Sequence, residues 1–142
     1  QVGGVSYSPE EVAFGKKIQE SLGAPAPPVA QAAEVAPYVA RDLGGSSDVG
    51  DVSYVVPTVG LLAATWIPGT PAHSWQAVAC SGREIGSKGM LVAAKTMALT
   101  AIDLFSDAEL VAKAKAELKQ KVGSYVYKPL LGDRKPALNY RD

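Results

Sequence analysis

The chain of 142 residues contains one histidine, His73, and one cysteine, Cys80. Chemistry that needs an imidazole or a thiol must therefore use these two side chains. His73 lies in the stretch PGTPAHS, directly after the apolar run VGLLAATWI. Glycine and two prolines so close together predict a tight turn. A lone histidine more often has a structural or surface role than a chemical one, so the neighbouring residues decide how it is interpreted.

A complete zinc site is not expected within this chain. Zinc needs three or four converging imidazole, thiolate or carboxylate ligands. The sequence offers His73, Cys80 and scattered acids, without a His-Glu-x-x-His motif, paired cysteines or a second histidine. A cofactor-free hydrolase in which His73 activates Cys80 is a further alternative, since seven residues separate them. No local signature supports it, and a buried, inert thiol is the expectation for Cys80.

A second polar motif, GGSSDVGDVS, occupies residues 44–53. Its glycines, hydroxyls and carboxylates predict a turn that leads into a short helix. Ser47 or Asp48 suits the N-cap position, which leaves backbone N–H groups free to bind an anion or to orient a carboxylate. A capped turn without any ligand is the alternative.

Three helices are predicted, over residues 9–22, 84–105 and 106–122. The first begins with a capping box formed by Ser8 and Glu11, and the last with a second box of the same type. The middle helix is apolar around most of its circumference and is expected to pack on a sheet or between layers. These helices define the surfaces against which the two polar motifs must be positioned.

Extended segments are predicted between and after these helices. Residues 59–67 are apolar throughout and predict a strand that is buried on both faces, as in a sheet covered by helices. Residues 75–80 predict a second short extended segment. The tail, residues 124–142, predicts a short strand followed by an extended arm, and residues 24–45 predict a long irregular connection with one helical turn. The fold class is therefore α/β, in a single domain.

Composition limits the partners and the compartment. Lys and Arg together number 14, as do Asp and Glu, so no field of one sign attracts nucleic acid or an anionic membrane. No apolar run approaches the roughly 18 residues needed to span a bilayer, and the first residues do not form a signal peptide. A single cysteine fits a reducing compartment, so a cytoplasmic location is expected.

Four stretches together resemble one family. These are GGSSDVGDVSYVVPT, ATWIPGTPAHSWQ, KGMLVAAKTMALTAIDL and the Lys-Pro-containing tail. They resemble the C-terminal section of the zinc-dependent amidohydrolases of the aminoacylase and carboxypeptidase group, in particular the branch of p-aminobenzoyl-glutamate utilisation hydrolases and related dipeptidases. The resemblance implies a partial three-layer α/β/α sandwich, with helices packed on a mixed sheet and the family's lid domain absent.

The resemblance also implies a chemistry. The family hydrolyses the amide bond of N-acyl amino acids or dipeptides with two divalent metal ions, zinc or manganese. Its last metal ligand is a histidine in a Gly/Pro turn, which corresponds to His73. Ser47, Asp48 and Thr70 correspond to residues that support the metals or line the substrate cleft. A neutral imidazole on a proline-restricted turn loses little entropy when it ligates a metal, which agrees with this role.

The family's other metal ligands, its catalytic glutamate and its lid all precede the segment that this chain resembles. The chain is therefore expected to be the C-terminal part of such an enzyme, inactive alone and unable to hold both metals. Its first residue is not Met, which fits a part of a longer protein. The expected partner is the missing N-terminal part or a second copy. The alternative is a non-catalytic, stand-alone α/β module for interaction or oligomerisation.

Overall fold

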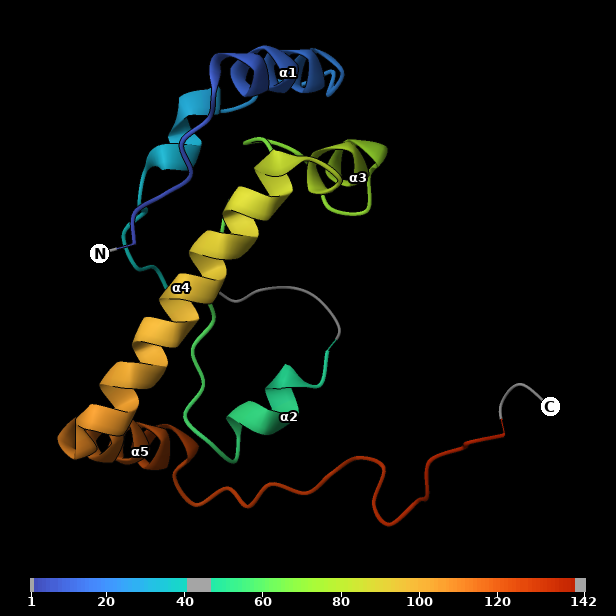
Figure 1. The fold of residues 1–142 in the computed structure, drawn as a ribbon. Helices are drawn as coiled ribbons and strands as arrows, with labels where there is room; N and C mark the ends of the chain where they lie inside the picture. The colour runs from blue at the N-terminus through green and yellow to red at the C-terminus, as the bar shows by residue number, and fades with distance from the viewer. Residues whose placement is uncertain (1, 41–46, 140–142) are drawn as a thin grey trace. The chain divides into compact units, whose positions relative to one another are not determined.

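The computed structural model describes residues 2–40 and 47–139, and the chain divides into two compact units (Figure 1). The first unit comprises Gln1–Arg41 and Gly60–Ser106, and the second comprises Asp42–Val59 and Asp107–Asp142. The first unit contains α1 (Pro9–Glu20), the 3-10 helix η1 (Val29–Ala33), α3 (Trp75–Ser81) and α4 (Glu84–Ser106). The second unit contains α2 (Val49–Ser53) and α5 (Ala108–Val122).

The predicted α/β class is wrong for the described residues, which are helical and contain no strand or sheet. Residues 59–67, predicted as a buried strand, run as an irregular segment instead. A strand needs a hydrogen-bonded neighbour to satisfy its backbone groups. Here the Thr65 N–H donates within the segment itself, to Ala63 O at 2.9 Å. The mixed sheet and the three-layer sandwich therefore have no counterpart in the described parts of the chain.

Two shorter predictions of extended structure are also wrong. Residues 75–80 lie in α3, because Ser74 caps a helix there and accepts a hydrogen bond from the Ala77 N–H at 3.1 Å. The described part of the tail, residues 124–139, has turns in place of the predicted strand, as when the Gly132 N–H donates to Pro129 O at 3.1 Å. In both cases local hydrogen bonds satisfy backbone groups that a sheet would otherwise pair.

The helix predictions are confirmed, with small shifts at the ends. In α1, Ser8 Oγ accepts from the Glu11 N–H at 3.3 Å and Glu11 Oε2 accepts from the Ser8 N–H at 2.6 Å, which is the predicted capping box. The helix α4 covers the predicted residues 84–105. The cap of α5 differs from the prediction, because Asp107 Oδ1 accepts from the Leu110 N–H at 3.0 Å.

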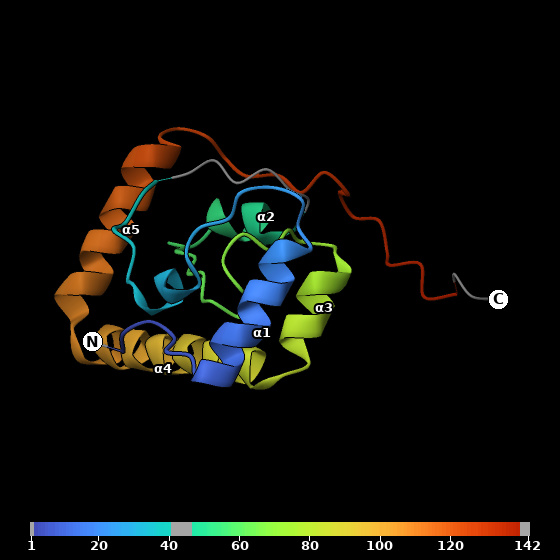
Figure 2. The same ribbon diagram turned by 90° about the horizontal axis from the view of Figure 1, so that it is seen from above.

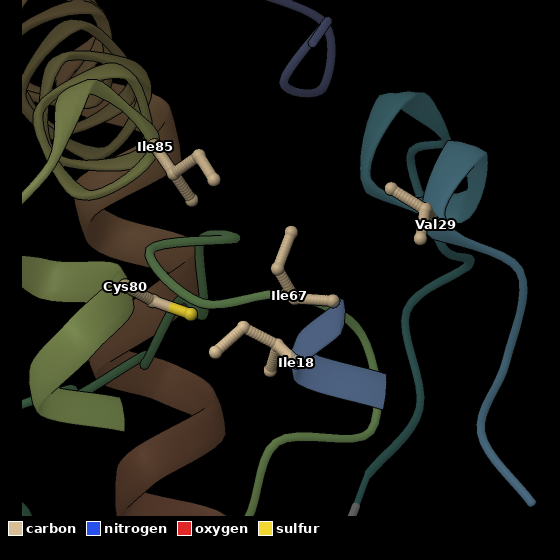
Figure 3. Close-up of a cluster of buried hydrophobic side chains, with 5 residues drawn as sticks. All are labelled: Ile18, Val29, Ile67, Cys80 and Ile85. Atoms are coloured by element: carbon tan, nitrogen blue, oxygen red, sulfur yellow. The ribbon is translucent and has the colours of Figure 1, made fainter. Parts of the chain in front are cut away.

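A small hydrophobic core organises the first unit. Figure 3 shows Ile67 in the middle of side chains contributed by several elements. The buried cluster consists of Ile18 on α1, Val29 on η1, Ile67, Cys80 on α3 and Ile85 on α4. Ile67, Cys80 and Ile85 are at most 1% exposed. Burial of Ile67 therefore fixes the end of the segment that leads to the turn carrying His73.

Two glycines allow the backbone to approach this core closely. A Cβ added to Gly89 would collide with the carbonyl group of Ala64, so the irregular segment crosses α4 at this glycine. A Cβ added to Gly15 would lie 2.8 Å from Ile67 Cδ1. Side chains at these positions would push the segment away from both helices.

The helix α4 is buried only near its beginning. Ile85, Gly86 and Gly89 are its buried residues, whereas large apolar side chains further along are exposed: Met90, Leu91, Met97, Leu99, Ile102, Leu104 and Phe105. By length and composition alone α4 could cross a membrane, contrary to the expectation from the sequence, because two isolated lysines do not interrupt its apolar character. Core helices of soluble proteins have the same properties, so this finding does not show a membrane protein.

One ion pair connects α1 to α4 in the first unit. Lys88 Nζ lies 2.6 Å from Glu11 Oε2 and also donates to Ser6 O at 3.3 Å. The hydrogen bond from Lys88 holds the pKa of the Glu11 carboxyl below its usual value, and the capping bond from the Ser8 N–H acts in the same direction. Glu11 therefore has two functions, as a helix cap and as the partner of Lys88.

The second unit is held together by polar and aromatic contacts. Tyr54, just after α2, lies against Tyr125 and Tyr127 with ring centroids 5.2 and 6.1 Å apart, and Tyr127 Oη donates to Asp51 Oδ1 at 2.7 Å. This hydrogen bond raises the pKa of Tyr127. The helix α5 has the i,i+4 ion pairs Lys113–Glu109 and Lys121–Glu117, and no buried residue.

The central position of Ile67 predicts a large effect of its truncation. We expect Ile67→Ala to lower the free energy of unfolding by about 2–5 kcal/mol, because it leaves a cavity among four packed elements. Leu62→Ala is the control, since Leu62 is 85% exposed and should change stability by less than about 0.5 kcal/mol. Urea unfolding followed by tryptophan fluorescence measures both values, and equal effects would contradict this description of the core.

The Glu11–Lys88 pair predicts a pH dependence. Because the folded-state pKa of Glu11 lies below 4.5, the pair stabilises the protein above that pH, and the contribution disappears as the pH falls through the folded-state pKa. The stability difference between the parent chain and Glu11→Gln should therefore be greatest near neutral pH and shrink in acid. Glu20→Gln, on the same helix, is the control. A difference that is constant from neutral to acid pH would contradict the assignment.

Candidate functional site

The only imidazole in the chain lies in the turn of residues 68–74, here called the His73 turn. It begins directly after buried Ile67 and ends at the cap of α3. Two residues have positive φ, Gly69 at 91° and His73 at 58°. Gly69 also lies so near the preceding loop that an added Cβ would be 2.7 Å from Ala26 Cβ. The predicted Gly/Pro turn is therefore confirmed.

Internal hydrogen bonds close the His73 turn. The Thr70 N–H donates to Ile67 O at 3.0 Å, which forms its first half. Ser74 Oγ donates to Pro71 O at 2.7 Å and accepts from the Ala77 N–H at 3.1 Å. Ser74 thus begins α3 and closes the loop that carries the histidine. The turn and the helix form one connected hydrogen-bonded structure.

Two further side chains join this structure to α1. Gln19 Nε2 donates to Pro68 O at 3.0 Å and to Pro27 O at 2.7 Å. Gln76 is 8% exposed, and its Nε2 donates to Ser21 Oγ at 3.3 Å. As Figure 2 shows, α1 and α3 lie beside each other at this end of the first unit. Elements far apart in the sequence therefore hold the turn.

His73 itself combines a strained backbone with an uncommitted ring. A non-glycine residue in the left-handed region costs about 1–2 kcal/mol, although histidine is one of the types that tolerates it. The residue is exposed, and within residues 2–40 and 47–139 neither ring nitrogen has a hydrogen-bond or ion-pair partner. An accessible imidazole of this kind has the chemistry to ligate a metal ion.

Thr70, the other predicted cleft residue of this turn, is half-buried. Its Oγ1 atom is shielded from solvent and has no hydrogen-bond partner among the described residues. A buried hydroxyl without a partner costs about 1–3 kcal/mol. The predicted role of Thr70 in supporting a metal or a substrate stays a prediction.

Ser47 and Asp48 belong to the second unit, whereas His73 and Thr70 belong to the first. Both Ser47 and Asp48 are exposed. Ser47 Oγ accepts from the Val49 N–H at 3.3 Å, while Asp48, at the N-cap position of α2, makes no capping hydrogen bond through its side chain. Of the two predicted caps, Ser47 therefore makes the bond. Its neighbours 44–46 in the same motif lie outside the described residues.

The structure gives Cys80 a place in the core, as expected for an inert thiol. The residue is fully buried between α1 and the Ile67 segment (Figure 3). Burial, with the nearby Cys80 and Glu11 adding to it, raises the pKa of the Tyr7 hydroxyl to about 12. A substrate cannot reach a thiol in this position, and His73 lies exposed. The observed positions do not support a Cys80 and His73 hydrolase.

Residues 2–40 and 47–139 include no group of three or more His, Cys, Asp and Glu side chains close enough to hold a metal ion. The metal-binding chemistry that this turn offers is that of a single imidazole, His73. One such ligand fits zinc, manganese or another divalent ion equally, provided that other ligands come from elsewhere.

Sequence reasoning missed Gln19 and Gln76. Gln19 is an ordinary polar residue of the first predicted helix, next to Ile18. Gln76 lies in a segment that was predicted to be extended. Neither position carries a pattern that indicates contact with a turn 49 residues away, or with a helix 55 residues away. Tertiary structure brings Gln19 on α1 to the loops at Pro27 and Pro68, and Gln76 on α3 to Ser21 at the end of α1.

The chain is 44% identical over 96 residues to one of the subunits of the p-aminobenzoyl-glutamate hydrolase of Escherichia coli (strain K12). The match covers 66% of this chain and 20% of the relative, so the chain spans about a fifth of the length of the protein it matches. Wherever a match covering 66% of the 142 residues begins, it must include residues 49–94. These residues contain the His73 turn. This similarity supports the amidohydrolase and peptidase family that the sequence motifs resemble. No family model matches the chain, and no solved structure matches it.

The backbone of His73 predicts how substitutions affect folding. We expect His73→Asn to change the free energy of unfolding by less than about 0.5 kcal/mol, because asparagine tolerates positive φ and the ring makes no hydrogen bond to the residues that the structure describes. His73→Val should lower it by about 1–3 kcal/mol, since a β-branched residue is strained there. Urea unfolding checks both. Similar losses for the two variants would mean that the imidazole itself supports the fold.

Proposed function

We propose that this chain provides the C-terminal part of a metal-dependent amidohydrolase. The enzyme hydrolyses the amide bond of p-aminobenzoyl-glutamate, or of related N-acyl amino acids and dipeptides. The observation that carries this proposal is the 44% identity to the E. coli hydrolase polypeptide over a stretch that includes the His73 turn. The motifs around Asp48 and His73 led to the same family independently of that comparison.

In this proposal His73 supplies one metal ligand. Its imidazole is accessible and has no other bond among the described residues, and its backbone lies in a turn that hydrogen bonds close on both sides. A pair of divalent ions, zinc or manganese, would polarise the amide carbonyl and supply an activated water when bound. His73 would present a ring nitrogen to the metal, oriented by the turn that carries it. The remaining ligands come from polypeptide outside this chain.

The exposed face of α4 supports association with such polypeptide. Most of its large apolar side chains from Met90 to Phe105 are exposed, by between 42% and 93%. Monomeric soluble proteins rarely expose contiguous apolar patches of this kind without a partner. The relative is named as one subunit of its enzyme and is about five times longer than the stretch it matches. We therefore propose that α4 packs against the rest of a cytoplasmic hydrolase, and that the chain alone is inactive.

The same apolar face favours the alternative function. A stand-alone interaction or oligomerisation module would use α4 to bind a second copy, and it would need no metal ligand. In that case His73 would be dispensable for every measurable property. The two proposals therefore differ in what His73 does.

A chimera tests the proposal. The matching stretch of the E. coli hydrolase polypeptide is replaced by the chain's own residues, in cells that supply the rest of that enzyme. We expect the chimera to hydrolyse p-aminobenzoyl-glutamate and to contain bound metal. His73→Asn in the chimera should lower kcat/KM by more than about 100-fold and reduce the metal content, because loss of a ligand exceeds the effect of losing an outer-shell partner.

Full activity and full metal content in the His73→Asn chimera would reject the proposal. The isolated chain is the second control, and we expect no hydrolysis from it. If the chimera is inactive while the isolated chain forms a stable oligomer whatever residue occupies position 73, the interaction module is the better description. Sedimentation velocity of the isolated chain measures that oligomeric state.

A further inference from the structure

Two amide side chains tie the His73 turn to the end of α1, one on each side of the histidine. Before it, Gln19 Nε2 donates to Pro68 O at 3.0 Å. After it, Gln76 Nε2 donates to Ser21 Oγ at 3.3 Å and to Ser21 O at 3.4 Å. Gln19 and Ser21 both belong to the C-terminal end of α1. The stretch that carries the imidazole is therefore held at both ends by the same part of one helix.

These ties matter because the ring of His73 is placed by the backbone that carries it. Among the described residues the imidazole of His73 has no hydrogen bond, so its position depends on the backbone that carries it. That backbone is in the left-handed region at φ 58°, and a change to negative φ would swing the ring to another direction. A change of that size moves the flanking residues as well. Bonds at Pro68 and Gln76 oppose such a movement.

The amides are suited to this function. Both N–H groups of the Gln19 side chain have acceptors available, Pro68 O and Pro27 O, so one residue joins α1, the preceding loop and the turn. Gln76 is a buried polar side chain, which would be costly without its bonds to Ser21. Removal of either amide frees one end of the turn without changing the chemical identity of the imidazole.

We infer that Gln19 and Gln76 are positioning residues for His73, which hold its imidazole in the orientation that ligates a metal. This inference rests on the proposed ligand role of His73. Pre-organisation of a ligand reduces the conformational freedom that binding must remove, and partners that orient metal ligands affect metal affinity by about 10–100-fold. The two glutamines act through the backbone of the turn and do not touch the metal.

The test uses Gln19→Met and Gln76→Met in the chimera described above. Methionine has nearly the length of glutamine and no N–H donors. Gln31→Met, at an exposed glutamine of η1, is the matched control. Zinc affinity is measured by competition with a chelator, and thermal unfolding is measured separately. We expect each of the first two variants to bind zinc about tenfold more weakly, and the control to bind it unchanged.

A second measurement uses the 142-residue chain without metal. The backbone amide of His73 should give a heteronuclear NOE typical of rigid structure, which falls in Gln19→Met or Gln76→Met and stays unchanged in Gln31→Met. If one variant fails to fold, the other completes the test. Folded variants with unaltered zinc affinity and NOE would overturn the inference.

The outcomes separate this inference from the proposed function. If His73→Asn leaves zinc affinity unchanged, the ligand role of His73 fails and the proposed function fails with it. If His73→Asn removes zinc binding while Gln19→Met and Gln76→Met do not weaken it, only the positioning role fails. Loss of affinity in Gln31→Met as well would indicate a general effect on stability, and would also count against positioning.

Discussion

The burial of Ile67 is the constraint on which the first unit depends. This side chain belongs to one buried cluster with residues of α1, η1, α3 and α4. Its burial fixes the end of an otherwise irregular segment, which has no neighbouring strand among the described residues to hold it. The turn that follows begins one residue later, so the burial of Ile67 also helps to set the position of His73. Full burial of an isoleucine contributes about 1.5–3 kcal/mol, enough to hold a segment that hydrogen bonds alone would not fix.

Around that contact the hydrogen bonds are distributed unevenly. The apolar segment of residues 59–67 has few, whereas the turn after it has bonds to its own residues, to α3 and to α1. A hydrogen bond contributes about 0.5–1.5 kcal/mol net, so the bonds from Gln19 and Ser74 can offset the left-handed backbone of His73. Strain of this kind persists where the surroundings determine the conformation, and such places are frequent at functional sites. The exposed ring at this position is consistent with the proposed metal ligation.

The two ends of the helix α4 differ in how far they are buried. Its first turns contribute Ile85 to the core and use Gly89 for the close crossing of the Ala64 backbone. From Met90 onward most of its large apolar side chains are exposed, although a helix that is apolar around most of its circumference is usually buried. This exposed apolar side is the surface on which the proposed association of α4 with further polypeptide rests.

The sequence by itself determined the three longer helices, α1, α4 and α5, and the His73 turn, because their signals are local. A capping box needs only Ser8 and Glu11, and the His73 turn needs only its prolines and Gly69. The sequence also indicated the family through its motifs. It failed for residues 59–67 and 75–80, since apolar composition cannot distinguish a strand from an irregular segment or a short helix when the partner strands are not present. Tertiary structure alone decided that Ile67 joins four elements, that Cys80 is inaccessible and that Gln19 and Gln76 flank His73, because these contacts join residues far apart in the chain and have no local signature.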